Sequence, residues 1–228
     1  MSGNLGIEPE PKATIQRFNS DGSNQTTYAS GMRNPTALAF QPETGQLWAL
    51  VQERDGLGDN LPSDYLIHVQ QGGFYGWPYA YTGKHPQPGF ANLAPDKVAA
   101  SITPDLLFQA HSSLLDLVFY EGDQFPTEYK GSLFVALKGS WNRSKPTGYK
   151  VVLVPFNDRK PLDTTKTSPR ASGCQARAEP RCGGALRCWR LQKMVRYWWV
   201  MTRAARSGAF PTTGSGRRRA GQILLTSR

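Results

Sequence analysis

Apolar segments in the first 165 residues are short, and no apolar spacing of three to four residues persists long enough to predict a helix of useful length. Glycine, proline, asparagine and aspartate separate these segments, which is typical of strands joined by turns. Ser20–Gly22 and Glu43–Gly45 are predicted to close hairpins, because glycine tolerates the positive φ that such turns need. We therefore predict an all-β fold. The expected strands are Thr14–Phe18, Thr26–Ala29, Ala37–Phe40, Leu47–Val51, Tyr65–Gln70, Leu115–Tyr120, Leu133–Leu137 and Lys150–Pro155.

One strand–turn–strand pattern occurs twice in this part of the chain. Ala37–Phe40, a turn and Gly45–Leu50 match Asp116–Tyr120, a longer turn and Gly131–Leu137. The glycines that open the second strand of each copy are separated by about two repeats of a β-propeller blade, at roughly 40–45 residues per repeat. Several blades explain this spacing better than a single β-sandwich does.

Polar residues stand directly before two of the predicted strands. Arg33 offers a planar set of donors and Asn34 offers a donor and an acceptor, which suits a ligand rich in carboxylate and carbonyl oxygens. Pro35 disfavours helical backbone at Asn34 and so predicts an extended conformation. Because the first strand of each propeller blade lines the central channel, we expect Arg33, Asn34 and His111 to gather at one mouth. A surface turn without a ligand remains the alternative for Arg33 and Asn34.

Gln52–Lys97 is long and rich in glycine, proline and tyrosine, and we predict that it forms an excursion at the channel mouth. Its aromatic residues leave a second function open. In a noncatalytic carbohydrate-binding or scaffold propeller they would form a stacking platform for a sugar. These residues are Phe74, Tyr75, Trp77, Tyr79 and Tyr81.

Basic residues are concentrated at the end of the chain. The 228 residues carry a formal net charge of +10, yet 14 of the 27 lysines and arginines and only one acid, Glu179, follow residue 165. Nucleic-acid binding requires such charge on a folded reader, so we predict no nucleic-acid partner. No segment approaches the roughly 18 apolar residues of a membrane span. Met1–Lys12 lacks the basic and apolar regions of a secretory signal.

Residues 166–228 show no strand or helix period, and we predict an irregular tail after a partial propeller in residues 1–165. A disordered basic arm, a small cysteine site and a shifted reading frame are the competing explanations. The spacing of Cys174, Cys182 and Cys188 does not form paired C-x-x-C motifs, which argues against zinc.

The genetic code favours the shifted frame. Read one nucleotide earlier, degenerate codons for Lys193–Ala205 allow a string beginning D-G-S-L-L-V, which resembles the start of the repeated second strand. We therefore hypothesise a frameshift near Thr164–Lys166.

Three ordered motifs resemble the glucose/sorbosone dehydrogenase family: Ser30–Pro35, Gly72–Pro78 and Gly139–Arg143. Gly148–Val152 is most similar to the sorbosone dehydrogenase branch. The resemblance covers about Thr14–Pro161 and implies a six-bladed β-propeller that uses pyrroloquinoline quinone. It also implies oxidation of an aldose or sorbosone-type sugar by hydride transfer to that quinone.

The resemblance assigns roles to particular positions. It implies that Arg33 and Asn34 contact the quinone oxygens and stabilise the negative charge that develops there. Arg143 is a candidate for a cofactor carboxylate, with a salt bridge at the rim as the alternative. The resemblance also implies a bound calcium ion, and calcium prefers hard oxygen ligands. The candidate ligands are Asp55, Asp59, Asn60 and Asp64. The alternative is that these residues form a solvated acidic loop.

The sequence also departs from the family pattern. The family's catalytic base is a histidine upstream of the motif that contains Arg33, and no histidine precedes Arg33 here. His111 remains as a candidate base, with a structural role as the alternative. We therefore expect a propeller fragment that lacks earlier blades and is inactive alone. Members of the family work in the periplasm, whereas the missing export signal favours a cytoplasmic location for this chain.

Overall fold

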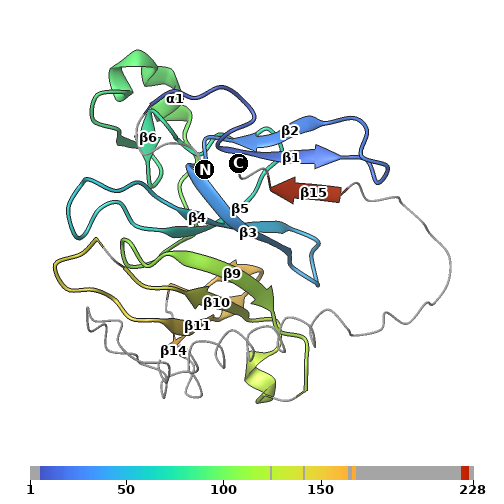
Figure 1. The fold of residues 1–228 in the computed structure, drawn as a ribbon. Helices are drawn as coiled ribbons and strands as arrows, with labels where there is room; N and C mark the ends of the chain where they lie inside the picture. Colours follow the sequence, from blue (N-terminus) through green and yellow to red (C-terminus); the bar gives the residue numbers. More distant parts are fainter. Residues whose placement is uncertain (1–5, 124, 141, 164–165, 168–221, 226–228) are drawn as a thin grey trace, which may run out of the picture.

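The computed structural model describes residues 6–123, 125–140, 142–163, 166–167 and 222–225, and these are mostly strand and loop (Figure 1). One α-helix, α1 (Pro95–Ala100), and two 3-10 turns, η1 (Ala91–Leu93) and η2 (Thr127–Tyr129), are present in this part. No helix within these ranges has the length and apolar character needed to cross a bilayer. The prediction of an all-β fold is confirmed.

Two four-stranded antiparallel sheets follow one another along the chain, with the strand orders β3-β4-β5-β8 and β9-β10-β11-β14. In both sheets the chain crosses from one edge to the other in sequence order, as it does in a propeller blade. The first sheet contains β3 (Asn34–Phe40), β4 (Leu47–Gln52), β5 (Tyr65–His68) and β8 (Leu106–Leu107). The second contains β9 (Leu114–Phe119), β10 (Leu133–Leu137), β11 (Lys150–Val154) and β14 (Lys166–Thr167).

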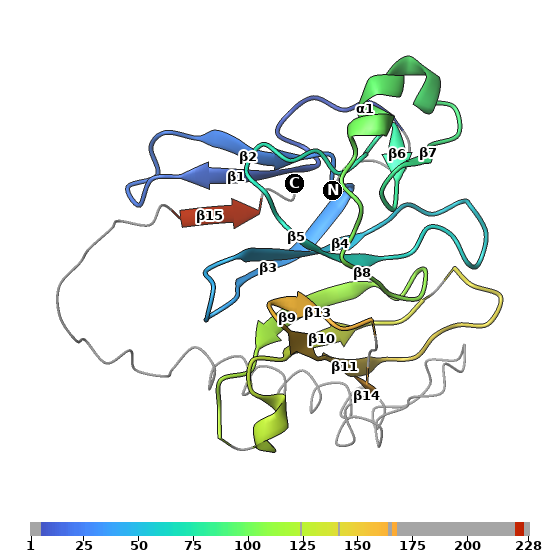
Figure 2. The ribbon, with the colours of Figure 1, turned by 180° about the vertical axis from the view of Figure 1, so that it is seen from behind.

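A third sheet has the order β15-β1-β2 and lies on the other side of the β3 sheet (Figures 1 and 2). It is formed by β1 (Thr14–Phe18), β2 (Thr26–Ser30) and β15 (Gln222–Leu225). Two small ribbons complete the strands: β6 (Ala80–Tyr81) pairs with β7 (His85–Pro86), and β12 (Phe156–Asn157) pairs with β13 (Lys160–Pro161).

Two short parts of the predicted irregular tail are strands. β14 pairs with β11 and β15 pairs with β1, so these six residues belong to sheets rather than to an irregular segment. The three cysteines and the Lys193–Ala205 segment of the frameshift hypothesis lie outside the described residues.

The sheets pack face to face through apolar side chains. Trp48 and Leu50 of β4 pack in one cluster with Leu117 of β9 and Val135 of β10, between the two four-stranded sheets. A second cluster joins the β1–β2 hairpin to the other face of the β3 sheet. It includes Ile15, Ala29, Met32, Val51 and Ile67. The three sheets therefore form layers with a separate apolar core at each contact.

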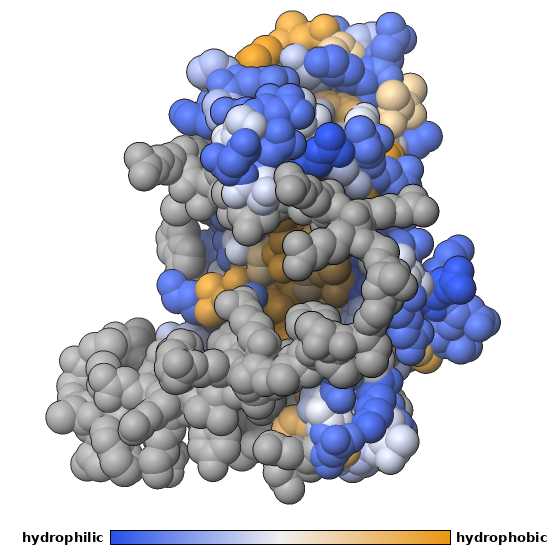
Figure 3. Space-filling view, turned by 90° about the vertical axis from the view of Figure 1, so that its right-hand side faces the viewer, coloured by the Kyte–Doolittle hydropathy of each residue, from blue (hydrophilic) through white to orange (hydrophobic). Residues whose placement is uncertain are grey.

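Apolar side chains are also exposed on the first strands of the two four-stranded sheets. Phe40 at the end of β3 is 53% exposed and Leu115 in β9 is 49% exposed. Figure 3 shows hydrophobic surface between more hydrophilic parts on one side of the molecule. In a propeller the first strand of each blade lies beside the central channel, and β3 and β9 lie side by side here (Figure 1).

The repeated sequence pattern falls in neighbouring sheets, and the predicted spacing of about two blades is wrong. Gly45 precedes β4 and Gly131 precedes β10, which hold the same place in consecutive sheets. The additional length comes from residues 69–105, which are inserted between β5 and β8 and contain β6, β7 and α1. The predicted excursion at Gln52–Lys97 is accordingly two segments, one on each side of β5.

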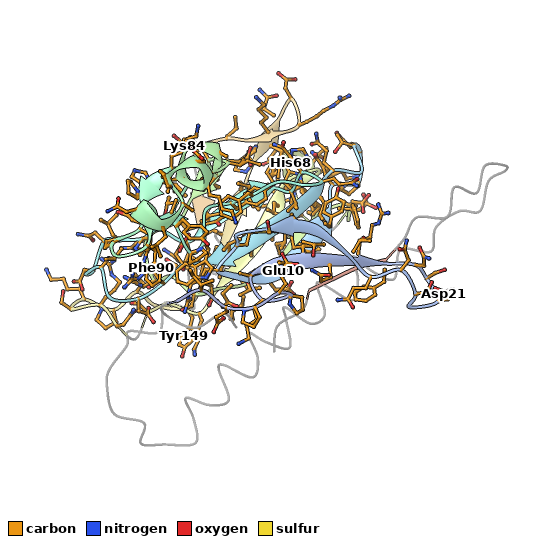
Figure 4. The ribbon with its side chains drawn as sticks, turned by 90° about the horizontal axis from the view of Figure 1, so that it is seen from above. Glu10, Asp21, His68, Lys84, Phe90 and Tyr149 are labelled. Carbon is orange, nitrogen blue, oxygen red and sulfur yellow. The ribbon has the colours of Figure 1, made fainter. Side chains whose placement is uncertain are left out.

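Antiparallel alternation determines which loops meet. The connections β2–β3, β4–β5, β8–β9 and β10–β11 share one end of the sheets, and the β1–β2 and β3–β4 turns share the other. In Figure 1 the loops after β4 and β10 extend together to the left, and the β3–β4 turn lies to the right. From above, Asp21 marks the β1–β2 turn on one side, whereas Phe90 and Tyr149 lie on the other (Figure 4). We call the end that carries the β2–β3, β4–β5, β8–β9 and β10–β11 connections the loop end.

Two of the predicted motifs contact each other at the loop end. The Ser30 N–H donates to the Gly73 carbonyl at 3.0 Å, and the Tyr75 N–H donates to the Ser30 carbonyl at 2.9 Å. Gly31 has a φ of +77°, and a Cβ atom there would lie 2.6 Å from Cε2 of Phe74. Glycine is needed at position 31 for both its backbone conformation and its lack of a side chain.

We predict that Gly31→Ala lowers the free energy of unfolding by about 2–4 kcal/mol, because it combines a left-handed backbone with a steric clash. Gly45→Ala is the matched control, since Gly45 has a φ of +67° but a Cβ atom there would meet nothing within 4 Å. It should cost only about 1 kcal/mol. Denaturant unfolding of both variants measures the difference, and equal losses would contradict the steric explanation.

Candidate functional site

Arg33 and Asn34 are fixed at the loop end, just before and at the start of β3. They are 8% and 9% exposed. The Arg33 Nη1 atom donates to the Glu53 carbonyl at 2.8 Å, and the Asn34 Nδ2 atom donates to Oε1 of Gln52 at 3.1 Å. Burial lowers the pKa of Arg33, and the carboxylates of Asp55, Glu53 and Asp64 oppose this shift. The extended conformation predicted for Asn34 is confirmed, since it begins β3.

Glu53 is a buried carboxyl that the sequence patterns did not single out. Its Oε1 atom accepts from the Thr82 N–H and its Oε2 atom accepts from the Arg54 N–H, both at 3.3 Å. Burial raises the pKa of Glu53 to about 7, although these hydrogen bonds and Arg33 favour the charged form. The one sequence signal was the polar and charged run Gln52–Arg54 at the end of an apolar strand.

Asp64 connects the two four-stranded sheets. Its Oδ1 atom accepts from the Glu53 N–H and its Oδ2 atom accepts from the Ser113 N–H, both at 2.9 Å. Burial raises the pKa of Asp64 to about 6, against the effect of these two hydrogen bonds. Both carboxylate oxygens therefore hold backbone groups of two loops.

His111 lies beside this junction, and both of its ring nitrogens are engaged. Nε2 is 2.8 Å from the Gly58 carbonyl, which can only accept, so Nε2 carries the proton. Nδ1 lies 3.2 Å from Nδ2 of Asn142 and 3.5 Å from Oδ1 of Asp55. In the neutral ring, Nδ1 accepts from Asn142, so neither nitrogen is left to take a proton from a sugar. The contacts support the structural alternative for His111.

Arg143 holds two loops together. Its Nη1 atom donates to the carbonyls of Asp59 and Ala110, and Nη2 donates to Oδ1 of Asn60 at 3.3 Å. The next residue, Ser144, donates its N–H and hydroxyl to the Asp59 carboxylate, and these bonds lower the pKa of Asp59. These contacts favour a structural clamp over a group that awaits a cofactor carboxylate. Trp141 of the same motif lies outside the described residues.

The four residues predicted to bind calcium do not form a calcium site with their side chains. Asp55 accepts from Asn142, Asp59 accepts from Ser144, Asn60 accepts from Arg143, and Asp64 accepts two backbone N–H groups. Across the part of the chain that the structure describes, no group of three or more His, Cys, Asp or Glu residues could hold a metal ion. The four side chains therefore do not gather into one ligand set, because each is directed to a separate protein donor.

Two residues of the predicted aromatic platform are internal, whereas Phe74, Tyr79 and Tyr81 are partly exposed. Tyr75 and Trp77 are 1% and 4% exposed. The Tyr75 hydroxyl donates to the His68 carbonyl at 3.0 Å and accepts from the Gln70 N–H at 2.8 Å. Buried rings cannot stack on a bound sugar, so Tyr75 and Trp77 stabilise the 69–105 insertion instead.

Hydrogen bonds join the loops that carry the predicted residues. Arg33 binds Glu53, Glu53 binds Asp64, and Asp64 binds Ser113, two residues after His111. Arg33 of this group and the neighbouring Asn34 place a buried cation and a held amide at one position, which are the two groups of the predicted quinone contact.

Family models match most of the described chain. The glucose/sorbosone dehydrogenase model matches residues 10–140, and a TrAA12-like model matches residues 93–194. An uncharacterized protein of Borreliella burgdorferi is 34% identical over 157 residues, which are 68% of this chain and 41% of that protein. A pyrroloquinoline quinone-dependent pyranose dehydrogenase of Coprinopsis cinerea is 37% identical over 93 residues, 38% of this chain and 12% of the enzyme.

One solved structure shows the same fold. The holo form of the pyranose dehydrogenase PQQ domain from Coprinopsis cinerea superimposes with a TM-score of 0.51 at 23% identity, covering 70% of this chain and 47% of that chain. A calcium structure of a Trichoderma reesei enzyme of family AA12 has a TM-score of 0.48 at 23% identity, covering 64% and 42%. The chain spans less than half the length of each of these relatives.

We predict that Asp64→Asn lowers the free energy of unfolding by about 1–3 kcal/mol, because one backbone N–H then faces an amide nitrogen. The loss should be the same with and without calcium, since Asp64 holds two loops. Thermal unfolding of both forms in calcium and in chelator measures this. A wild-type chain that calcium stabilises through Asp64 would contradict the structural role.

We predict that wild-type stability falls as pH rises through about 4.5 to 7. The pKa of Glu53 is raised by folding, so its contribution is complete below the unfolded pKa of about 4.5 and is lost as pH passes the folded pKa of about 7. The loss should be on the order of 2–3 kcal/mol. Glu53→Gln should flatten the upper part of this profile. The control Glu43→Gln, at an exposed turn, should not, and an unchanged Glu53→Gln profile would refute the assignment.

Proposed function

The chain belongs to the glucose/sorbosone dehydrogenase family, and from that premise we propose that Arg33 and Asn34 form one wall of a pyrroloquinoline quinone site. The observation that carries this proposal is the burial of both side chains at the start of β3, where Glu53 and Gln52 hold them. A guanidinium and an amide match the carboxylate and carbonyl oxygens of this cofactor. When bound, the quinone supplies an electrophile that accepts a hydride.

Within this proposal Arg33 supplies positive charge where negative charge develops. It remains protonated despite the lowered pKa, because a guanidinium does not lose its proton in proteins. A cation held in a buried position acts more strongly than one in water, and its orientation is set before reaction.

The proposed substrate of the complete site is an aldose or a sorbosone-type sugar, oxidised at its aldehyde or hemiacetal carbon. The pyranose dehydrogenase similarity supports a sugar. We propose that this chain alone does not turn over, because none of its three histidines precedes Arg33, where the family resemblance places the base. His111 is engaged at both ring nitrogens, His68 packs on Trp48, and Nδ1 of His85 bonds the Thr82 carbonyl.

Three further expectations remain proposals. Calcium is proposed from the family resemblance, but not with the side chains of Asp55, Asp59, Asn60 and Asp64 as its ligands. A periplasmic location is proposed from the same resemblance. The frameshift near Thr164–Lys166 is a hypothesis that the TrAA12-like match weighs against, because that match continues to residue 194. Independent resequencing of the coding DNA tests it, and an intact frame would exclude it.

The quinone proposal is tested by titrating the full chain with pyrroloquinoline quinone, with and without calcium, and following tryptophan fluorescence. We expect saturable binding, weakened at least about tenfold by Arg33→Ala, which removes a charge-assisted contact. Arg17→Ala on β1 is the matched control and should bind as the wild type does. No wild-type binding, or equal effects of the two variants, would overturn the proposal.

Turnover is measured separately, by dye reduction with an aldose after quinone is added. We expect no sugar-dependent reduction. Sugar-dependent reduction by the full chain would show that a base is present and would contradict the proposed inactivity while leaving the quinone site in place.

A further inference from the structure

Gln52 connects the proposed quinone wall to the neighbouring sheet. It is the last residue of β4 and pairs with Asn34 across the β3–β4 ladder. Its Oε1 atom accepts from Nδ2 of Asn34 at 3.1 Å, and its Nε2 atom donates to the Leu114 carbonyl at 2.6 Å. Leu114 is the first residue of β9. One side chain therefore contacts the first residues of two neighbouring strands at the loop end.

The two hydrogen bonds run in one direction, with Asn34 donating to Gln52 and Gln52 donating to Leu114. A backbone carbonyl can only accept, so Leu114 requires the NH₂ group of Gln52 on its side. The Gln52 carbonyl then faces Asn34 and can only accept, which requires the NH₂ group of Asn34 on that side. Both amide orientations are thus fixed by a peptide group in the neighbouring sheet. Among the described residues no other hydrogen bond of the Asn34 side chain is present, so its Oδ1 atom and its second N–H can serve a ligand.

We propose that Gln52 is a positioning residue for the quinone site, which fixes the orientation of the Asn34 amide and holds it relative to β9. This inference rests on the proposed function of Arg33 and Asn34. Arg33 has a separate support, the Glu53 carbonyl, so Gln52 acts on Asn34 and leaves the cation in place.

Few side chains can replace Gln52. Leucine has a similar size but neither amide group. Glutamate can accept from Asn34, but it has no N–H for the Leu114 carbonyl, and its charge faces that oxygen. Gln52→Leu therefore removes both contacts, whereas Gln52→Glu removes only the contact with the Leu114 carbonyl. Gln46→Leu, near the opposite end of the same two strands, is the matched control.

The first experiment measures the apo chain by NMR through the side-chain NH₂ resonances of Asn34. In the wild type we expect two well-separated proton resonances with slow exchange, because one N–H is hydrogen-bonded. Gln52→Leu should reduce the separation towards that of a solvent-exposed asparagine, Gln52→Glu should shift the resonances less, and Gln46→Leu should leave them unchanged. Unchanged Asn34 resonances in folded Gln52→Leu would overturn the inference, whatever the chain binds.

The second experiment measures quinone affinity in a double-mutant cycle of Gln52→Leu and Asn34→Ala. If Gln52 acts through Asn34, Gln52→Leu should weaken binding by about tenfold in the wild type and have almost no effect in Asn34→Ala. Equal losses in both backgrounds would refute positioning and indicate general destabilisation. If the wild type does not bind the quinone, the proposed function fails, and the resonances of Asn34 still decide whether Gln52 orients it.

Discussion

The arrangement of the loop end depends on one buried carboxylate. Asp64 accepts an N–H from the loop after β4 and another from the loop before β9, so it joins two sheets whose faces pack through apolar side chains. Apolar packing has little direction, whereas two hydrogen bonds to one carboxylate specify how the loops meet. Burying that carboxylate has an energetic cost, which its raised pKa records.

The side chains of the proposed site are positioned, directly or through Gln52, by backbone groups. Asp64 holds the Glu53 peptide, and the Glu53 carbonyl holds Arg33. Asn34 is held through Gln52, whose other contact is the Leu114 peptide. The proposed quinone wall, Arg33 and Asn34, is therefore positioned by the two sheets, and its own residues stay available for polar chemistry. Polar groups around a buried cation also limit the cost of its desolvation.

Sequence patterns predicted the strands well because glycine and proline mark the turns between them, as Gly22 and Gly45 do at the two hairpins. The blade spacing was misjudged because an insertion lengthens one sheet without altering its strand pattern. The patterns singled out Arg33 and Asn34, whose place at the start of a strand is local information. They could not show that His111 and Arg143 hold loops, because their partners near Gly58 and Asp59 are distant in sequence. Glu53 and Gln52 were missed because their significance depends on burial and on facing residues.

The contact between the 69–105 insertion and β2 also protects a strand edge. β2 is an outer strand of its sheet, and such strands present unpaired N–H and C=O groups that can pair with another chain. Gly72 donates to the Tyr28 carbonyl, and Gly73 and Tyr75 bond Ser30 on the same strand. An insertion from one sheet thus occupies the free edge of the sheet before it. Substitutions that loosen it would expose a template for intermolecular strand pairing, and aggregation would then accompany any loss of local order.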